Sequence, residues 1–338
     1  MILPLSLGER SYDIVVRRGV LHQASEFLQL NRKALIVTDD GVPAEYAQTV
    51  AAQCATPVLV TLPQGETTKS MACFELLCRT MLEHGFTRTD CVVAVGGGVI
   101  GDLAGFAAAS FMRGIDFYNL PTTLLSQVDS SIGGKVAIDL DGVKNIVGAF
   151  YQPKKVLIDP DTLASLDPRH LAAGMAEAVK MSATFDKDLF ETIERADDPY
   201  TIVEDIIIGS LKLKRMVVEQ DEKEQGLRKV LNFGHTVGHA VETLFGDQYF
   251  HGECVALGML PMCNYEVRRR LIPLFKRLGL PTVYPECNKT QLMMVAAHDK
   301  KADGFDITVV FVPKIGEYEM RKIHFDQLET YLEGDLWK

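Results

Sequence analysis

One stretch decides the fold of the first half of the chain: Cys91-Val-Val-Ala-Val95-Gly96-Gly-Gly98-Val-Ile-Gly101-Asp102. Its β-branched run predicts a buried strand, the glycines predict a turn, and the alanine-rich residues 103–109 predict a helix. A strand, a glycine turn and a helix N-terminus together present free backbone N–H groups to a pyrophosphate. The glycines match G-x-G-x-x-G, yet the turn follows the fourth predicted strand instead of the first. We therefore predict a nucleotide-binding fold only loosely related to the usual dinucleotide fold.

Short β-branched runs alternate with helical patterns before this stretch. The predicted strands are residues 13–16, 34–37, 58–61 and 91–95, and the predicted helices between them are 42–54 and 69–84. This alternation predicts an α/β domain with a mainly parallel sheet. With 338 residues, the chain is long enough for two domains, which we place at 1–160 and 161–338. The second domain is predicted to be mostly α-helical, with a hairpin formed by 307–312 and 318–321.

Composition and charge exclude several classes of protein. No apolar run reaches the roughly 18 residues that a membrane helix needs, and the first residues lack the pattern of a signal peptide. A net charge of −10 disfavours binding to nucleic acid or to anionic lipid. The seven cysteines include no Cys-x-x-Cys pair, which is typical of reduced thiols in a cytoplasmic protein. We expect a cytoplasmic location, with no membrane and no nucleic-acid partner.

A histidine cluster in the second half predicts a metal site. His235, His239 and His251 lie within 17 residues and are three of the eight histidines. His235 and His239 have i, i+4 spacing, so both rings project from one face of a helix. Imidazole nitrogens are ligands that divalent cations accept. The alternative, surface histidines on an amphipathic helix, is less favoured for a cluster than for one histidine.

A catalytic metal site usually also contains a carboxylate, and the sequence offers several. Glu177 and Lys180 have i, i+3 spacing on a predicted helix, which is also the pattern of an ordinary surface ion pair. The small residues at 172–176 argue against a surface pair, because they would let another element pack close. Spacing alone leaves Glu242 and Glu253, near the histidines, as competitors.

The middle of the chain combines glycines with cations and hydroxyl groups. Residues 113–135 and 142–145 contain paired threonines, an aspartate, glycine pairs and lysines. Glycines allow the backbone to approach a ligand, and lysines supply charge to a phosphate or a carboxylate. Asp39, just after the second strand run, could accept hydrogen bonds from a ribose; an ordinary turn residue is an equal alternative.

Six segments resemble 3-dehydroquinate synthases, of the sugar phosphate cyclase family. They are Gly96–Asp102, Arg113–Gly114, Pro121–Lys135, Lys144–Asn145, Gly174–Lys180 and Asn232–His239, and the resemblance extends from Glu66 to Lys301. It implies an NAD-dependent and metal-dependent carbon–oxygen lyase acting on a small sugar phosphate, 3-deoxy-D-arabino-heptulosonate 7-phosphate. It also implies the products, 3-dehydroquinate and phosphate, by transient oxidation at C5, β-elimination, re-reduction, ring opening and aldol closure. This reaction is the second step of the shikimate pathway.

The resemblance also implies which residues bind the metal and the substrate. Glu177, His235 and His251 are the implied ligands of Zn²⁺ (or Co²⁺), and three protein ligands leave positions open for substrate oxygens. His239, which spacing alone would make a ligand, is instead implied near the substrate phosphate. Arg113 is implied to reach the neighbouring subunit's site, and hence a homodimer. The implied substrate-binding and catalytic residues are Asp129, Lys135, Asn145, Lys180, Lys214, Arg228, Asn232, His239, Arg113 and one of Lys300 or Lys301.

The implied NAD site draws on the first domain. Its residues are Asp39, Glu66, Lys69, Gly97, Gly98, Asp102, Thr122, Thr123, Leu125, Asp129, Lys135, Lys144 and Ser165. One position departs from the family, since Gly41 stands where many members carry asparagine beside the nicotinamide nucleotide. That cofactor contact is therefore not carried over to this chain.

Three other functions compete with this hypothesis. A sugar phosphate cyclase that makes a different carbocycle is disfavoured by Arg228, Asn232 and His239, which are expected to recognise the carboxylate and the phosphate. A metal-dependent polyol or glycerol dehydrogenase would have no use for so many phosphate-binding cations. A non-catalytic NAD-sensing or scaffold protein would be expected to lose some metal or lysine positions, and none is lost.

Overall fold

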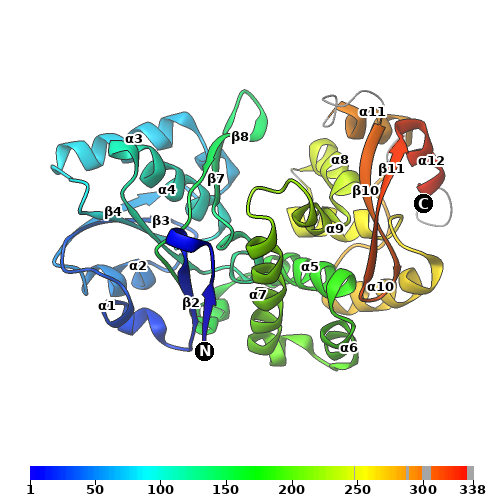
Figure 1. The fold of residues 1–338 in the computed structure, drawn as a ribbon, viewed down its shortest axis with the longest axis horizontal. Coiled ribbons are helices and arrows are strands. Elements are labelled where there is room, and N and C mark those ends of the chain that lie inside the picture. Colours follow the sequence, from blue (N-terminus) through cyan, green and yellow to red (C-terminus); the bar gives the residue numbers. More distant parts are fainter. Residues whose placement is uncertain (247, 287–288, 299–305, 333–338) are drawn as a thin grey trace. The chain divides into compact units, whose positions relative to one another are not determined.

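The chain folds into two compact units, Met1–Leu166 and Asp167–Lys338 (Figure 1). The computed structural model describes residues 1–338 except 247, 287–288, 299–305 and 333–338. The division predicted at 160/161 falls inside a short 3₁₀ helix, η6 (Pro160–Ser165). Among the described residues, no helix has the length and apolar character needed to cross a lipid bilayer.

A mainly parallel seven-stranded sheet forms the centre of the first unit, in the order β1-β2-β9-β6-β5-β3-β4. Only β1 and β2 pair antiparallel, and each other neighbouring pair is parallel. The α/β prediction is therefore confirmed, and the four predicted strand runs lie within β2, β3, β4 and β5. The strands are β1 (Ile2–Leu5), β2 (Tyr12–Val16), β3 (Lys33–Asp39), β4 (Thr56–Leu62), β5 (Cys91–Gly96), β6 (Asp116–Pro121) and β9 (Lys155–Ile158).

Helices cover both faces of this sheet because its central strands are apolar on both sides. One core joins Ala47 and Val50 of α2 (Ala44–Ala51) to residues of β3 and β5, and the other joins α3 (Met71–Glu83) and α4 (Gly98–Ser110) to the opposite face. Every residue of β5 is buried. The shorter helices are η1 (Gly8–Arg10), η2 (Val20–Gln23), α1 (Ala24–Phe27) and η3 (Glu66–Thr68).

Several features of the first unit differ from the sequence-based expectation, and β1 and β9 were not predicted at all. The helix predicted for 103–109 begins earlier, at Gly98, because Gly97 is its N-cap and Gly98 and Gly101 lie in its first turn. The polar residues 113–153, for which no strand was predicted, contain β6, an antiparallel hairpin and a π-helical turn. The hairpin consists of β7 (Lys135–Leu140) and β8 (Val143–Phe150), and the π-helical turn is η5 (Ser126–Ser130). A short 3₁₀ helix, η4 (Phe111–Arg113), precedes β6.

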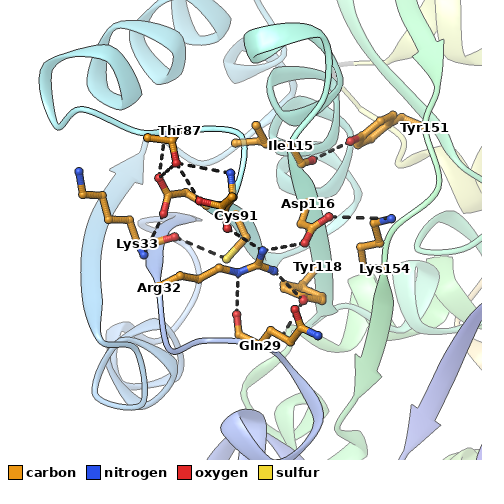
Figure 2. A network of polar contacts seen from close by, with 12 residues as sticks. Gln29, Arg32, Lys33, Thr87, Cys91, Ile115, Asp116, Tyr118, Tyr151 and Lys154 are labelled. Atoms are coloured by element: carbon orange, nitrogen blue, oxygen red, sulfur yellow. Dashed lines mark hydrogen bonds and ion pairs between the residues drawn. The ribbon is translucent and has the colours of Figure 1, made fainter.

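Arg32 ties together the amino-terminal ends of three parallel strands (Figure 2). Its guanidinium donates to Asp116 at the start of β6 (2.7 Å), to the hydroxyl of Tyr118 (2.9 Å) and to the carbonyls of Gln29 and Thr89 (2.8 Å each). Only 15% of the Arg32 side chain is exposed. Burial, a charged partner and four acceptors make this a stronger contact than a solvent-exposed ion pair.

Replacing Arg32 by methionine should therefore destabilise the first unit. We expect the Arg32→Met variant to lose about 2–4 kcal/mol of the free energy of unfolding, because Asp116 keeps its charge without its main partner. Urea unfolding followed by circular dichroism measures the loss. Arg79→Met is the matched control, since the pair of Arg79 with Glu75 is mostly exposed and worth at most about 1 kcal/mol. Equal losses in the two variants would contradict the prediction.

The second unit is mostly helical, as predicted, and its central helix is α5 (Pro168–Phe185), which is buried from Ala172 to Thr184. The predicted hairpin is also present, as β10 (Asp306–Lys314) with β11 (Glu317–His324). The other elements are α6 (Lys187–Arg195), η7 (Pro199–Ile202), α7 (Val203–Gln220), η8 (Leu227–Asn232), α8 (His235–Phe245), α9 (His251–Met259), α10 (Tyr265–Leu278), α11 (Lys289–His298), η10 (Phe325–Gln327) and α12 (Leu328–Tyr331).

Glycines allow α5, α8 and α9 to approach at backbone distance. A Cβ atom on Gly258 of α9 would lie 1.9 Å from the carbonyl oxygen of Gly234, the N-cap of α8. A Cβ atom on Gly252 would lie 2.0 Å from the carbonyl oxygen of Ala173 on α5. Any larger residue at either position would separate two helices. The small residues at 172–176 thus permit close packing of another element, as their sequence suggested.

Candidate active site

The carboxyl ends of β3, β4, β5 and β6 form one edge of the sheet, because these strands are parallel. The chain passes from β3 to β4 on one side and later to β5 on the other, so the strand order reverses between β3 and β5. Ligands of open α/β sheets bind at such a reversal, beyond the carboxyl ends. Asp39 ends β3 there and Gly96 ends β5.

A pocket of about 490 Å³ opens beside Asp39 and is lined by the end of β3, the start of α2 and Ser165. The N–H of Gly41 donates to Oδ1 of Asp39 (3.0 Å), which fixes the orientation of the carboxylate. Burial raises the pKa of Asp39. A Cβ atom on Gly41 would lie 2.3 Å from the side chain of Gln64. The terminal amide of Gln64 thus occupies the space that a side chain at residue 41 would enter.

The glycine turn places the N-terminus of α4 against two hydroxyl side chains. Gly97 is the N-cap of α4, and a Cβ atom there would lie 3.0 Å from Thr123. A Cβ atom on Gly98 would lie 3.1 Å from Oγ of Ser130. The helix dipole and the free N–H groups at this end favour an anion. Sequence reasoning did not identify Ser130, because only the fold brings the π-helical turn to the glycines.

Lys69 connects residues that were predicted to bind different molecules. Its ammonium nitrogen lies 2.8 Å from Oδ2 of Asp102 and 3.7 Å from Oε1 of Glu66, and it donates a hydrogen bond to Oδ1 of Asn145. Burial acts to lower the pKa of Lys69, but the charges of Asp102 and Glu66 raise it overall, so the side chain remains a cation. Asp139 accepts the N–H of Asn145 (2.8 Å). Predicted cofactor and phosphate residues are therefore adjacent here.

The other predicted residues of the first unit lie at the ends of neighbouring elements. Thr122 follows β6 and donates its N–H to the carbonyl of Gly96 (2.9 Å). Arg113 is exposed in η4, with a left-handed backbone (φ 69°). Leu125 is the N-cap of η5, Asp129 lies within η5, Lys135 begins β7, and Lys144 lies on β8.

The second unit brings Glu177, His235 and His251 together, with one ligand atom of each within 4.8 Å of the others. Glu177 is 1% exposed, and neither of its carboxylate oxygens accepts a hydrogen bond, although Lys180 forms an ion pair with it. Burial, then the charge of Lys180, holds the pKa of His235 well below its usual value, so the ring is neutral. Two imidazoles, of which that of His235 is neutral, and a buried carboxylate without hydrogen bonds are a donor set that fits a divalent cation.

A second group, His239, Glu242 and His251, also has ligand atoms within 4.8 Å of one another. Nδ1 of His251 lies 3.0 Å from Oε2 of Glu242. Burial acts to lower the pKa of His251, but this hydrogen bond and the charges of Glu242 and Glu177 raise it overall. Glu253, the other competing carboxylate, instead pairs with Arg169 (2.6 Å) and accepts the N–H of Phe250 (2.7 Å).

Three further predicted cations of this unit are buried. Lys180 lies on α5, and α7 and η8, which carry Lys214 and Arg228, both pack against α5. Arg228 donates to the carbonyl of Glu222 (2.5 Å), and Asn232 donates to Oε1 of Glu224 (2.8 Å). Glu224 has a left-handed backbone (φ 59°) and was not identified from the sequence. Lys300 and Lys301 lie outside the described residues.

Comparison with known proteins assigns the family. A family model described as 3-dehydroquinate synthase N-terminal matches residues 59–173, and one described as 3-dehydroquinate synthase C-terminal matches residues 174–302. A 3-dehydroquinate synthase of Streptococcus suis (strain 05ZYH33) is 39% identical over 354 residues, covering 98% of this chain and 100% of the relative. The chain belongs to the 3-dehydroquinate synthase family. A 3-dehydroquinate synthase of Pelobacter propionicus is also 39% identical, over 97% of this chain and 98% of the relative.

Solved structures place the family fold among the sugar phosphate cyclases. 2-Deoxy-scyllo-inosose synthase complexed with carbaglucose-6-phosphate, NAD⁺ and Co²⁺ matches 98% of this chain and 99% of its own, with a TM-score of 0.88 and 23% identity. ValA, a 2-epi-5-epi-valiolone synthase of Streptomyces hygroscopicus with NAD⁺ and Zn²⁺ bound, has the same TM-score, 26% identity and 97% coverage of both chains. Glycerol dehydrogenase of Schizosaccharomyces pombe is less similar, with a TM-score of 0.64 and 16% identity over 94% of this chain and 87% of its own. The two family models and the relatives that are 39% identical confirm the predicted resemblance to 3-dehydroquinate synthases.

Proposed function

We propose that the chain is an NAD- and divalent-metal-dependent carbon–oxygen lyase of the shikimate pathway. Its substrate is 3-deoxy-D-arabino-heptulosonate 7-phosphate, and its products are 3-dehydroquinate and phosphate. The observation that carries this proposal is 39% identity to 3-dehydroquinate synthases over nearly the full length of both chains. The buried cations of the second unit support it, because the substrate carries a phosphate and a carboxylate.

The residues fall into two groups that hold two different cofactors. Glu177, His235 and His251 hold Zn²⁺ or Co²⁺, for which their donor atoms are suited. Bound NAD supplies a reversible hydride acceptor, and the cation supplies a Lewis acid. The NAD group consists of Asp39 and Ser165 at the pocket, Gly97 and Gly98 at the N-terminus of α4, the cluster of Glu66, Lys69 and Asp102, and Thr122, Thr123, Leu125, Asp129, Lys135 and Lys144.

A third group, which shares Asp129 and Lys135 with the NAD group, binds the substrate and moves its protons. Oxidation of the C5 hydroxyl acidifies the neighbouring C–H, so phosphate leaves by β-elimination; re-reduction, ring opening and an aldol step then close the carbocycle. Polar side chains next to the reacting atoms accept and return the protons of these steps. We assign Asp129, Lys180, Lys214 and Asn232 to the ring hydroxyls, Lys135 and Arg228 to the carboxylate, and Lys135, Asn145, His239 and Arg113 to the phosphate. One of Lys300 or Lys301 also contacts the substrate in this proposal.

The decisive experiment follows phosphate release and NADH absorbance together. Metal-loaded protein receives the heptulosonate phosphate and a trace of NAD. We expect many phosphates per NAD without lasting NADH, and 3-dehydroquinate as the product. NADH formed in step with substrate use would identify a polyol-type dehydrogenase instead. Turnover only with other sugar phosphates would identify a different cyclase, and no signal with any of them would overturn the proposal of an enzyme.

Removal of the Asp39 carboxylate tests the NAD site. We expect Asp39→Ala to weaken NAD binding about tenfold to hundredfold, which is the value of one or two lost hydrogen bonds from a ribose. Isothermal titration with NAD measures the dissociation constant. Glu45→Ala is the matched control, because it removes the same charge from α2 at a residue that does not line the pocket. An unchanged dissociation constant in Asp39→Ala would place the ribose elsewhere.

We infer that the protein forms a homodimer through its exposed hairpin. β8 is exposed at every position but Val147, and its exposed residues include Val143, Ile146 and Phe150. Apolar side chains gathered on one exposed element are typical of a surface that another chain covers. Arg113, also exposed, would then contribute to the phosphate site of the other subunit.

A charge on the hairpin should prevent this association. We expect Ile146→Asp, which places a carboxylate at a position that is 61% exposed in one subunit, to convert a dimer into monomers and to lower phosphate release strongly. Sedimentation equilibrium gives the molecular mass of each variant. Leu82→Asp is the control, because Leu82 is even more exposed (72%) but lies on α3. A monomeric unaltered protein would overturn the dimer proposal, as would a dimeric Ile146→Asp variant.

We also propose a cytoplasmic location. The six cysteines among the described residues are all without a disulfide. Burial raises the pKa of Cys91 and of Cys263 to about 12, so these thiols are unreactive. Fractionation of cells that express the protein tests the location directly.

A further inference from the structure

His251 is contacted at both ring nitrogens by different carboxylates. Its Nδ1 lies 3.0 Å from Oε2 of Glu242, and its Nε2 lies 3.6 Å from Oε1 of Glu177. Glu242 belongs to α8, the helix of His235 and His239, whereas His251 begins α9. Glu242 therefore lies at one nitrogen of the ring and Glu177 at the other.

The hydrogen-bond partners assign the tautomers of both histidines. Nδ1 of His235 lies 3.2 Å from the carbonyl oxygen of Phe233, which can only accept, so Nδ1 carries the proton. In His251 the partner of Nδ1 is a carboxylate, which also accepts. In the neutral form of each ring, the lone pair is therefore on Nε2. A hydrogen bond from the far nitrogen of a metal-binding histidine to a carbonyl or carboxylate is what fixes such a ring for binding.

We propose that Glu242 is a positioning residue that orients His251 for the cation and does not itself bind the ion. The inference rests on the metal site of the proposed function. It explains why two overlapping groups have ligand spacing, although one ion is needed. In the group of His239, Glu242 and His251, the nitrogen of His251 that faces Glu242 is Nδ1, which donates its proton to that carboxylate and so has no lone pair for an ion. In the other group, Nε2 of His251 lies 3.6 Å from Oε1 of Glu177, and neither carboxylate oxygen of Glu177 accepts a hydrogen bond.

A positioning role and a ligand role for Glu242 predict different results for one pair of substitutions. Glutamine at 242 keeps a carbonyl oxygen that accepts from Nδ1 of His251, whereas leucine keeps the volume and loses the acceptor. We expect Glu242→Leu to weaken Co²⁺ binding about tenfold to hundredfold, and Glu242→Gln to restore most of that loss. The visible absorption bands of bound Co²⁺ should keep their positions in Glu242→Gln, because the ligands are unchanged.

Two measurements on each variant test this. Titration with Co²⁺ gives the affinity and the spectrum, and urea unfolding of the metal-free protein gives the stability. Glu194→Leu is the matched control: it removes a partly buried carboxylate that pairs with Arg270 at 2.8 Å and that belongs to neither of the two groups with ligand spacing. We expect it to lower stability without changing Co²⁺ affinity or spectrum.

The outcomes separate this inference from the proposed function. Equal losses of affinity in Glu242→Gln and Glu242→Leu, with shifted Co²⁺ bands, would make Glu242 a ligand and overturn the inference while leaving a metal enzyme. Unchanged affinity in Glu242→Leu would also overturn it. If Glu177→Gln retains full Co²⁺ affinity while the Glu242 variants lose it, the ion belongs to the group of His239. A protein that binds no Co²⁺ at all would overturn the metal site of the proposed function itself.

Discussion

Replacing Glu177 by glutamine is expected to lower kcat/KM for phosphate release by at least about 10³-fold. The carboxylate is 1% exposed and accepts no hydrogen bond, so its charge is available to a cation and to Lys180. A neutral amide keeps the shape but removes that charge, which leaves Lys180 buried without its counter-ion. Steady-state phosphate release with a saturating supply of NAD and Co²⁺ measures the loss, and a Co²⁺ titration shows whether affinity has fallen with it.

A general loss of structure must be separated from this effect. Glu194→Gln removes a carboxylate of the same unit that pairs with Arg270, and should leave phosphate release within about twofold of the unaltered protein. Circular dichroism of Glu177→Gln should match that of the unaltered chain. Turnover of Glu177→Gln within tenfold of the unaltered protein, with Co²⁺ still bound, would show that the cation is held elsewhere.

The sequence predicted the part of the metal site that depends on one helix. Residues 235 and 239 share a face of α8 because helical spacing determines which side chains point together. Spacing could not choose among three carboxylates, because that choice depends on contacts between distant segments. Gly252 against Ala173 brings α9 to α5, and with it His251 to Glu177. The resemblance to a family selected Glu177, and the geometry gives the physical reason.

Strand β8 of the middle region was missed for a different reason. Alternation of apolar and polar residues marks a strand only when one of its faces is buried, and β8 is exposed on both. Its pairing with β7 follows from backbone hydrogen bonds, which leave no trace in composition. Ser130 and Glu224 were not identified from the sequence for a similar reason. Ser130 is positioned by a π-helical turn, and Glu224 by a left-handed backbone conformation. Buried parallel strands such as β5 were predicted because burial itself selects apolar β-branched residues.

Gly258→Ala is expected to destabilise the second unit by about 3 kcal/mol or more, a large effect for a single methyl group. The added Cβ atom would lie 1.9 Å from the carbonyl oxygen of Gly234 and 2.6 Å from the backbone nitrogen of Gly238. Backbone atoms cannot rotate away as a side chain can, so α8 and α9 must separate. Because α8 carries His235 and α9 begins with His251, separation should also weaken Co²⁺ binding. Urea unfolding and a Co²⁺ titration measure the two losses.

Gly209→Ala is the matched control, since Gly209 is also inside a helix, α7, and the change is the same. There the new Cβ atom would meet only the ends of the Leu189 side chain, at 2.9 Å, and these can move aside. Alanine favours a helix over glycine by about 1 kcal/mol, so we expect stability near that of the unaltered protein. Similar stability of Gly258→Ala and Gly209→Ala would contradict the argument, because helix propensity would then outweigh backbone contact between α8 and α9. A Gly258→Ala variant with unchanged stability but weaker Co²⁺ binding would instead show that the two helices separate without unfolding. The glycine contact would then matter more for the metal site than for the stability of the fold.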